Sequence, residues 1–137
     1  MKNSLNLKVY YKDTDAEGVV YYTKYLEMME MGRTELINDI GIPLTKLKKE
    51  HNIVFAVRKV NCEYLSPAFY ADDLIIESRI EKTSGATLTF KQDIIRKSDK
   101  TLLCSAITLL TSIDITKLKP KKIPETARNM LHNASHG

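Results

Sequence analysis

The chain has 137 residues, of which 43% are hydrophobic and 28% charged, a composition typical of one folded globular domain and unlike that of disordered or collagen-like chains. No apolar run reaches the roughly 18 residues that a membrane-spanning helix needs. The 21 basic and 17 acidic residues give a net charge of +4, but aromatic residues are not interleaved with the basic ones, so we expect a single domain over residues 1–137 without a nucleic-acid partner.

The first elements are a strand and a loop. Residues 5–11 alternate apolar and polar side chains, which predicts a half-buried strand. Residues 12–20 follow, and they contain residue types that favour turns and helix entries: Asp13, Thr14, Asp15, Glu17 and Gly18. We expect a loop there.

A long helix is predicted next. From about residue 22 to residue 40, apolar side chains recur every three or four positions, and Gly41 and Pro43 end the pattern. Gly32 lies inside this helix, where it costs about 1 kcal/mol relative to alanine. It marks either a close approach to a neighbouring backbone or a tolerated glycine.

The second half of the chain is rich in strand-forming residues. After a short charged helix or turn at 44–51, we expect four strands, at 53–65, 73–82, 86–96 and 101–115. The breaks between them are too short for parallel crossovers, so we expect each strand to pair antiparallel with the next. The sequence thus predicts an α+β fold in which an antiparallel sheet of about five strands wraps one helix. In this arrangement the strand 101–115 has an open edge.

The last segment, from about residue 116, carries most of the positive surplus and is expected to be a basic tail. The N-terminus lacks the apolar segment of a secretion signal, which favours the cytoplasm. Cys62 and Cys104 have neither CxxC spacing nor a nearby histidine, so we interpret both as reduced core or strand residues. We expect no metal and no other cofactor, because no ligand cluster or glycine-rich phosphate loop occurs.

The loop 12–20 is the candidate site. It places carboxylates just before the start of the long helix, where free amides and the positive end of the helix dipole lie. A carboxylate beside a spare N–H group could polarise a carbonyl and stabilise the oxyanion formed when that carbonyl is attacked. The alternative is that Asp13 or Asp15 simply caps the helix, and that Gly18 simply turns the corner.

Two motifs resemble one known family. The first is the run Tyr11-x-Asp13-Thr14-Asp15-x-x-Gly18-x-Val20-Tyr21-x-x-x-Tyr25-Leu26-x-x-x-Glu30, followed by Arg33. The second is Tyr64-Leu65-Ser66-Pro67-Ala68-x-Tyr70-x-Asp72-x-Leu74. Both resemble hot-dog-fold acyl-CoA thioesterases of the YbgC and hydroxybenzoyl-CoA thioesterase type, over about residues 5–115. The resemblance implies a hot-dog fold and hydrolysis of an acyl-CoA thioester to a free carboxylate and CoA.

The resemblance also assigns roles to individual residues. It implies that Asp15 is the catalytic carboxylate, either attacking the thioester carbonyl or activating water. The resemblance also implies that backbone amides at the start of the helix hold the thioester oxygen, which here means those of Val20, Tyr21 and Tyr22. Many YbgC-type members have histidine at the position of Tyr22, so its absence shifts the work to Asp15 and backbone dipoles. Further supporting residues are expected at Asp13, Gly18 and Tyr25.

Other side chains receive weaker expectations. Glu30 is expected to pair with Arg33 one helical turn away. At least two of Met28, Met29 and Met31 are expected in the core, although such flexible side chains could also line an acyl tunnel. Basic side chains are expected to attract the phosphates of CoA or an acidic acyl carrier protein: Arg58, Lys59, Lys82, Arg96 and the segment 117–122.

Two alternative functions are considered for the same fold. A protein of the same fold could bind acyl-CoA or acyl carrier protein without turnover, whereas a dehydratase or hydratase would need a histidine that the loop and helix lack. Hot-dog families join sheets edge to edge, and soluble proteins must cover open strand edges. We therefore expect at least a dimer, either a homodimer or a homotetramer.

Overall fold

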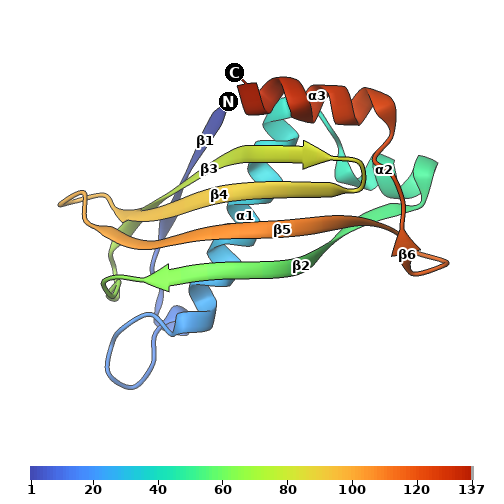
Figure 1. Ribbon diagram of the computed structural model, residues 1–137. Helices are drawn as coiled ribbons and strands as arrows, with labels where there is room; N and C mark the ends of the chain where they lie inside the picture. Colours follow the sequence, from blue (N-terminus) through green and yellow to red (C-terminus); the bar gives the residue numbers. More distant parts are fainter. Residues whose placement is uncertain (137) are drawn as a thin grey trace.

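Residues 1–136 are described by a computed structural model, in which a six-stranded antiparallel sheet curls around the long helix α1 (Figure 1). The elements in chain order are β1 (Lys2–Lys8), the 3-10 turn η1 (Tyr11–Asp13), α1 (Tyr22–Ile40), α2 (Leu44–His51), β2 (Ile53–Tyr64), β3 (Asp73–Ser84), β4 (Thr87–Arg96), β5 (Leu102–Asp114), β6 (Lys119–Pro120) and α3 (Glu125–His136). The expected α+β fold, a sheet wrapped over one long helix, is confirmed.

The order of the strands differs from the expected meander. It is β1-β3-β4-β5-β2, with β6 added beside β5. The expectation that β2 pairs with β3 is wrong, since β2 pairs antiparallel with β5, with Ile53 opposite Asp114. The open edge expected for residues 101–115 is also wrong, because β5 lies inside the sheet and the long free edge belongs to β2. A short break excludes a parallel crossover but does not fix which antiparallel neighbour a strand takes.

The first strand covers residues 2–8 instead of the expected 5–11. Asp13 ends the extended chain: its Oδ2 accepts the Tyr10 amide at 2.9 Å, and its own amide donates to the Tyr10 carbonyl at 3.0 Å. These local bonds fold residues 11–13 into a turn, although the alternating pattern continues through them.

Gly32 brings α1 very close to the sheet. A Cβ at this position would lie 2.7 Å from the Ile76 Cγ2 atom and 2.7 Å from the Ser78 Oγ atom. Gly32 is therefore needed for close packing, but the neighbours are side chains of the sheet and not the backbone that was expected. Alanine has no room here without displacing them.

A polar network joins α1 to the sheet beneath Gly32. The Gln92 Nε2 group donates to the Met29 carbonyl at 2.7 Å and to the Ser78 hydroxyl at 2.8 Å. Its Oε1 accepts from the Arg33 guanidinium at 3.1 Å. Within residues 1–136 no close ion pair joins Arg33 to Glu30, but burial lowers the pKa of Arg33 and the charge of Glu30 opposes that effect, so the two residues interact through their charges. The hydrogen bond of Arg33 goes to Gln92 in the helix–sheet interface.

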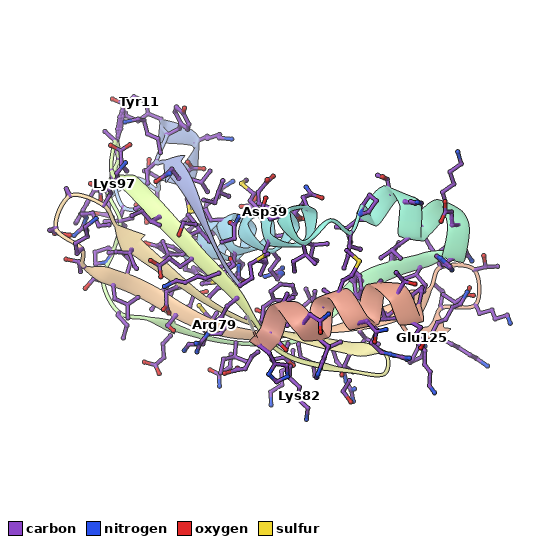
Figure 2. All side chains as sticks on the ribbon, turned by 90° about the horizontal axis from the view of Figure 1, so that it is seen from above. Tyr11, Asp39, Arg79, Lys82, Lys97 and Glu125 are labelled. Atoms are coloured by element: carbon purple, nitrogen blue, oxygen red, sulfur yellow. The ribbon has the colours of Figure 1, made fainter. Side chains whose placement is uncertain are left out.

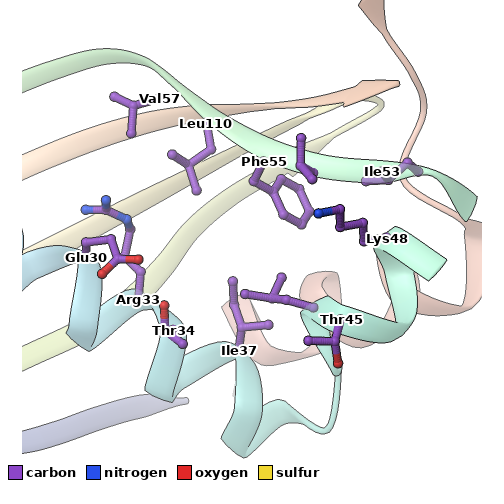
Figure 3. A pocket seen from close by; sticks show the side chains of 12 residues that line it. Glu30, Arg33, Thr34, Ile37, Thr45, Lys48, Ile53, Phe55, Val57 and Leu110 are labelled. Carbon is purple, nitrogen blue, oxygen red and sulfur yellow. The ribbon is translucent and has the colours of Figure 1, made fainter. Parts of the chain in front are cut away.

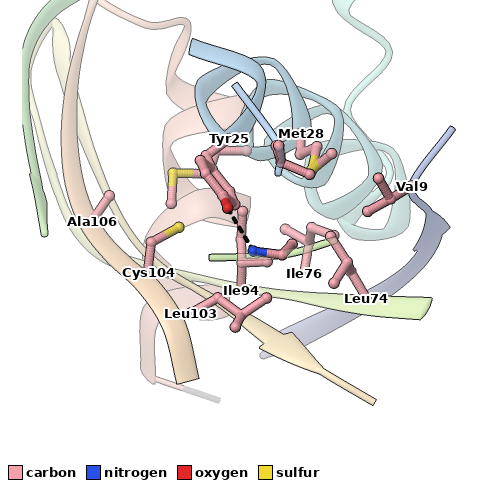
Figure 4. Close-up of a cluster of buried hydrophobic side chains, with 12 residues drawn as sticks. Val9, Tyr25, Met28, Leu74, Ile76, Ile94, Leu103, Cys104 and Ala106 are labelled. Atoms are coloured by element: carbon pink, nitrogen blue, oxygen red, sulfur yellow. Dashed lines mark hydrogen bonds between the residues drawn. The ribbon is translucent and has the colours of Figure 1, made fainter. Parts of the chain in front are cut away.

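Two clusters of buried apolar side chains fill the space between α1 and the sheet. The cluster near the start of α1 includes Val20, Tyr25, Met28 and Met29 (Figure 4). Met28 and Met29 are buried and Met31 is exposed, which confirms core packing for two of the three methionines. The second cluster lies under the end of α1, where α2 and α3 close the core.

The C-terminal segment is more than a basic tail. It ends in α3, a helix that packs against β3 and buries Ala127, Leu131 and Ala134. These residues recur at steps of four and three, the spacing of an amphipathic helix. The many charges of the segment obscure this short apolar stripe in the sequence.

Candidate active site

The loop before α1 is a small hairpin held by backbone hydrogen bonds. The Asp15 amide donates to the Val19 carbonyl at 2.9 Å, and the Gly18 amide closes the turn onto the Asp15 carbonyl at 3.1 Å. Gly18 has φ +81°, a left-handed conformation that favours glycine, so its expected role in turning the loop has a direct physical reason. The hairpin returns the chain to the start of α1.

The two aspartates of the loop have different surroundings. Asp13 is 8% exposed, and its carboxylate holds the Tyr10 amide, which makes it a structural cap of the preceding turn. Asp15 is exposed at the end of the hairpin, where its Oδ1 accepts the Glu17 amide at 2.8 Å. Among residues 1–136 nothing bonds to its second oxygen. Of the two aspartates, Asp15 is therefore the one whose side chain is exposed to solvent.

Only one of the three expected oxyanion donors has a free amide. The Val20 amide donates to the Ala68 carbonyl, and the Tyr21 amide donates to the Asp13 carbonyl, each at 2.9 Å. In the described part of the chain, the Tyr22 and Thr23 amides have no acceptor. They are the first two N–H groups of α1, where the helix dipole favours negative charge. The geometry thus leaves Tyr22, with Thr23 beside it, as the donors that an oxyanion could reach.

A hollow of about 250 Å³ opens at the start of α1. Its walls are formed by Val20, Tyr22, Tyr25, Tyr64, Leu65, Ser66 and Pro67. Tyr64 packs its ring against Tyr22, at 6.3 Å between centroids, and against Tyr25, at 5.7 Å. The sequence motif at residues 64–74 does not by itself assign residues 64–67 to the site, because only the fold shows that the end of β2 lies beside the start of α1.

The tyrosines of this hollow are neutral groups. The buried Tyr25 hydroxyl accepts the Ala68 amide at 2.9 Å, the dashed line in Figure 4, and burial raises the pKa of this phenol. Burial, together with the Cys62 thiol, raises the pKa of Tyr64 to about 12. Neither phenol ionises near neutral pH, so both act as walls and hydrogen-bonding groups of the hollow.

A second hollow, of about 340 Å³, lies farther along α1 between this helix, α2 and β2 (Figure 3). Its walls are mostly apolar and include Ile37, Phe55 and Leu110. Arg33 also reaches it, and burial lowers the pKa of its guanidinium. Because a helix rises about 1.5 Å per residue, Arg33 lies about 16 Å along α1 from Tyr22. The hollow is therefore well separated from the free amides.

The expected CoA-binding residues do not form one cluster. Arg58 and Lys59 lie on β2, where the pairing with β5 shifts between Val57 and Lys59. Lys82 lies toward the far end of β3, away from the Tyr11 end of the molecule (Figure 2). The structure thus separates Lys82 from the loop that carries Asp15.

Arg96 lies near the candidate site but is already bound. Its guanidinium donates to Asp72 at 3.0 Å, to Asp99 at 3.0 Å and to the Pro67 carbonyl at 2.6 Å. Asp72 is the main reason that the pKa of Arg96 is raised. Arg96 therefore holds the connection between β2 and β3 in place, and this connection forms one wall of the hollow at the start of α1.

The described part of the chain has neither a metal-binding cluster nor a membrane-spanning helix. Residues 1–136 contain no group of three or more His, Cys, Asp or Glu side chains placed to hold a metal ion. Over the same residues, none of the helices has the length and apolar character needed to cross a membrane. Cys62 and Cys104 are free thiols on β2 and β5, as expected.

Comparison with known proteins places the chain in a family. Residues 9–131 match the model of the thioesterase-like superfamily. The acyl-CoA thioesterase YbgC of Haemophilus influenzae is 32% identical over 130 residues, which cover 95% of this chain and 94% of that protein. The acyl-CoA thioester hydrolase YbgC of Escherichia coli is 38% identical over 120 residues, 88% of each chain.

A solved structure agrees with these matches. The crystal structure of a probable thioesterase from Bartonella henselae superposes with a TM-score of 0.83 at 31% identity, and the match covers 90% of this chain and all of that one. The family match at residues 9–131 includes α1, the strands β2 to β6 and the loop that carries Asp15. The chain therefore belongs to the thioesterase-like superfamily, with the hot-dog fold.

Proposed function

We propose that Asp15 and the first turn of α1 carry out the hydrolysis of an acyl-CoA thioester. The activity follows from the family: the chain is an acyl-CoA thioester hydrolase, related over nearly its whole length to YbgC thioesterases. The reading as a binding module without turnover is not favoured, because these relatives are hydrolases. The residues that perform the step are our proposal.

One observation carries the assignment of Asp15. The hairpin 14–20 bears a carboxylate with a free oxygen on one side and leads on its other side into the unpaired Tyr22 amide. A thioester carbonyl placed against the Tyr22 and Thr23 amides would have its developing negative charge stabilised. The exposed Asp15 carboxylate would then either attack the carbonyl carbon or take a proton from the water that attacks it.

Two routes use the same carboxylate. In the nucleophilic route, an Asp15 oxygen bonds to the carbonyl carbon, the C–S bond breaks and CoA leaves as the thiolate; water then hydrolyses the mixed anhydride. In the general-base route, Asp15 takes a proton from the water that attacks the carbonyl, and the C–S bond breaks as the tetrahedral intermediate collapses. Single turnover in ¹⁸O-labelled water, followed by mass spectrometry, reveals the anhydride if label enters Asp15.

The decisive experiment is a steady-state assay of CoA release by Asp15→Asn. We expect a folded enzyme whose kcat falls at least about a hundredfold, since the amide neither attacks nor accepts a proton. Glu17→Gln is the matched control, because it neutralises an exposed carboxylate of the same loop. Asp13→Asn keeps an oxygen acceptor for the Tyr10 amide, so its effect should be milder. A folded Asp15→Asn enzyme with a near-normal rate would show that the catalytic group lies elsewhere.

We also propose that the protein works as a homodimer or homotetramer. The edge strand β2 is 12 residues long, pairs within residues 1–136 only with β5, and exposes Val57, Val60 and Tyr64. Such an edge invites pairing with a second copy. Sedimentation at micromolar concentration tests this proposal, and a species of 15.6 kDa alone would contradict it.

The two free thiols support a proposal for the cellular location. Cys62 and Cys104 are free, which suits a reducing compartment, and we propose the cytoplasm as the location. Acyl-CoA is the substrate class, and an acyl carrier protein is a second donor to be tested with the same acyl chains. Assays across chain length and with aromatic acyl groups will define the acyl preference.

A further inference from the structure

We propose that residues 115–122, which comprise the turn after β5, the short strand β6 and the two residues that follow it, dock the protein on an anionic membrane surface. The turn joins one strongly exposed leucine, Leu118, to a group of lysines at a projecting end of the molecule. Figure 1 shows it extending past the end of the sheet, next to α2. This inference is independent of the catalytic role of Asp15.

Leu118 is held outward in an unfavourable conformation. Its residue is 76% exposed, and its backbone has φ 56°, in the left-handed region that glycine and asparagine adopt more readily than leucine. Its amide donates to the Asp114 carbonyl at 2.7 Å, which closes the turn. An apolar side chain with no place in the core is therefore maintained at a position where a smaller polar residue would fit the turn better.

The turn is built rigidly. The Asp114 carboxylate accepts the amides of Thr116 and Lys117, each at 2.9 Å, and these bonds lower the pKa of Asp114. The Asn52 side chain bridges the Asp114 carboxylate at 3.1 Å and the Thr116 hydroxyl at 2.7 Å. Because the turn is already ordered, little conformational freedom remains to be lost when it meets a surface.

The residues next to Leu118 in the chain carry several positive charges. The exposed lysines of the segment 115–122 are Lys117, Lys119, Lys121 and Lys122. The Lys121 ammonium donates to the His51 carbonyl at 2.7 Å, which fixes the end of α2 beside the turn. The neighbouring acidic groups are Asp114, Glu50 and Glu125, so the charge of the surface is positive.

A bilayer with anionic lipids uses both features of this surface. Lysines near such a membrane are attracted to the headgroups, and each adds about fivefold to binding. An exposed leucine inserts at the boundary between headgroups and acyl chains, as apolar side chains of interfacial segments do. A purely charged partner, such as an acidic protein or a nucleotide phosphate, would use the lysines but would leave Leu118 in water.

The test is co-sedimentation of the full chain with vesicles. We expect binding to an equimolar mixture of phosphatidylserine and phosphatidylcholine, no binding to phosphatidylcholine alone, and weakening by salt. The double variant Lys119→Gln/Lys122→Gln should lower the partition coefficient at least about tenfold. Its matched control, Lys97→Gln/Lys100→Gln, removes the same charge from the turn between β4 and β5 and should bind like the wild type.

Leu118→Asn decides between a membrane and a charged partner. Asparagine tolerates the left-handed backbone, so the turn is kept while the apolar side chain is removed. We expect roughly tenfold weaker binding to the mixed vesicles, with unchanged circular dichroism and thermal unfolding. The proposal is overturned if the mixed vesicles do not bind the protein at low salt, or if the control pair matters equally. It is also overturned if the Lys119/Lys122 variant weakens binding while Leu118→Asn does not, because the surface then recognises charge alone, as an acidic protein would.

Discussion

Substituting alanine for Gly32 tests how tightly α1 is seated on the sheet. Helix propensity alone favours alanine by about 1 kcal/mol. Against this, the new Cβ would lie 2.7 Å from two atoms of β3 and 3.0 Å from the Gln92 Nε2 atom. Overpacking of this kind costs about 1–3 kcal/mol. Displacing the buried Gln92 amide from its hydrogen bonds costs about 1–3 kcal/mol more. We therefore expect a net loss of about 3 kcal/mol in the free energy of unfolding.

The measurement is thermal and urea unfolding of purified Gly32→Ala. For a chain of this size, the expected loss lowers the Tm by about 10 °C. Asn38→Ala, on the exposed side of α1, is the matched control and should stabilise the protein by roughly 0.5 kcal/mol through propensity alone. An unchanged or raised Tm for Gly32→Ala would refute the reasoning, because the neighbours would then yield without cost.

Three further predictions follow from the structure. Tyr25→Phe leaves the buried Ala68 amide without an acceptor and should cost about 1–3 kcal/mol; an unchanged Tm would contradict this. The pKa of Asp114 is lowered from its ordinary 3.8, so its stabilising effect is present above pH 3.8 and lost as the pH falls through the folded-state pKa. Asp114→Asn should therefore lose less stability than the wild type in acid unfolding, and parallel acid profiles would exclude the effect. The KM for acyl-CoA should rise several-fold with salt while kcat changes little, since exposed charges are screened within about 8 Å at physiological ionic strength. Neutralising Arg58 and Lys59 together should flatten that dependence, and a KM insensitive to salt would show that charge does not attract CoA.

The elements of the fold were predictable because their signals are local. The helix at 22–40 and the strands of the second half follow from periodicity and end signals that lie within each segment. The partner of β2 was not predictable in this way. Its pairing with β5 depends on how the connection 65–72 crosses the end of the sheet, and no residue within β2 specifies that path.

The candidate site was predictable in its residue types but not in its hydrogen bonding. A carboxylate loop before the helix is visible in the sequence, and the free oxygen of Asp15 agrees with the role expected for it. That the Val20 and Tyr21 amides are already occupied depends on Ala68 and Asp13, which the fold brings to them. For the same reason, the wall made by Tyr64 became apparent only when the end of β2 was placed beside α1.

The polar network beneath Gly32 has a consequence for the position of α1. A helix that rests on a sheet through apolar contacts alone could slide along its axis by one turn, about 5.4 Å, with little change in buried area. Gln92 prevents this, because in any shifted register its buried amide would lose the Met29 carbonyl and the Arg33 guanidinium together. Gln92 thus fixes the position of α1 along its own axis, through contacts near the middle of the helix. Because α1 is a continuous helix from Tyr22 to Ile40, fixing its axial position at Gln92 also fixes the position of the Tyr22 amide relative to the Asp15 loop.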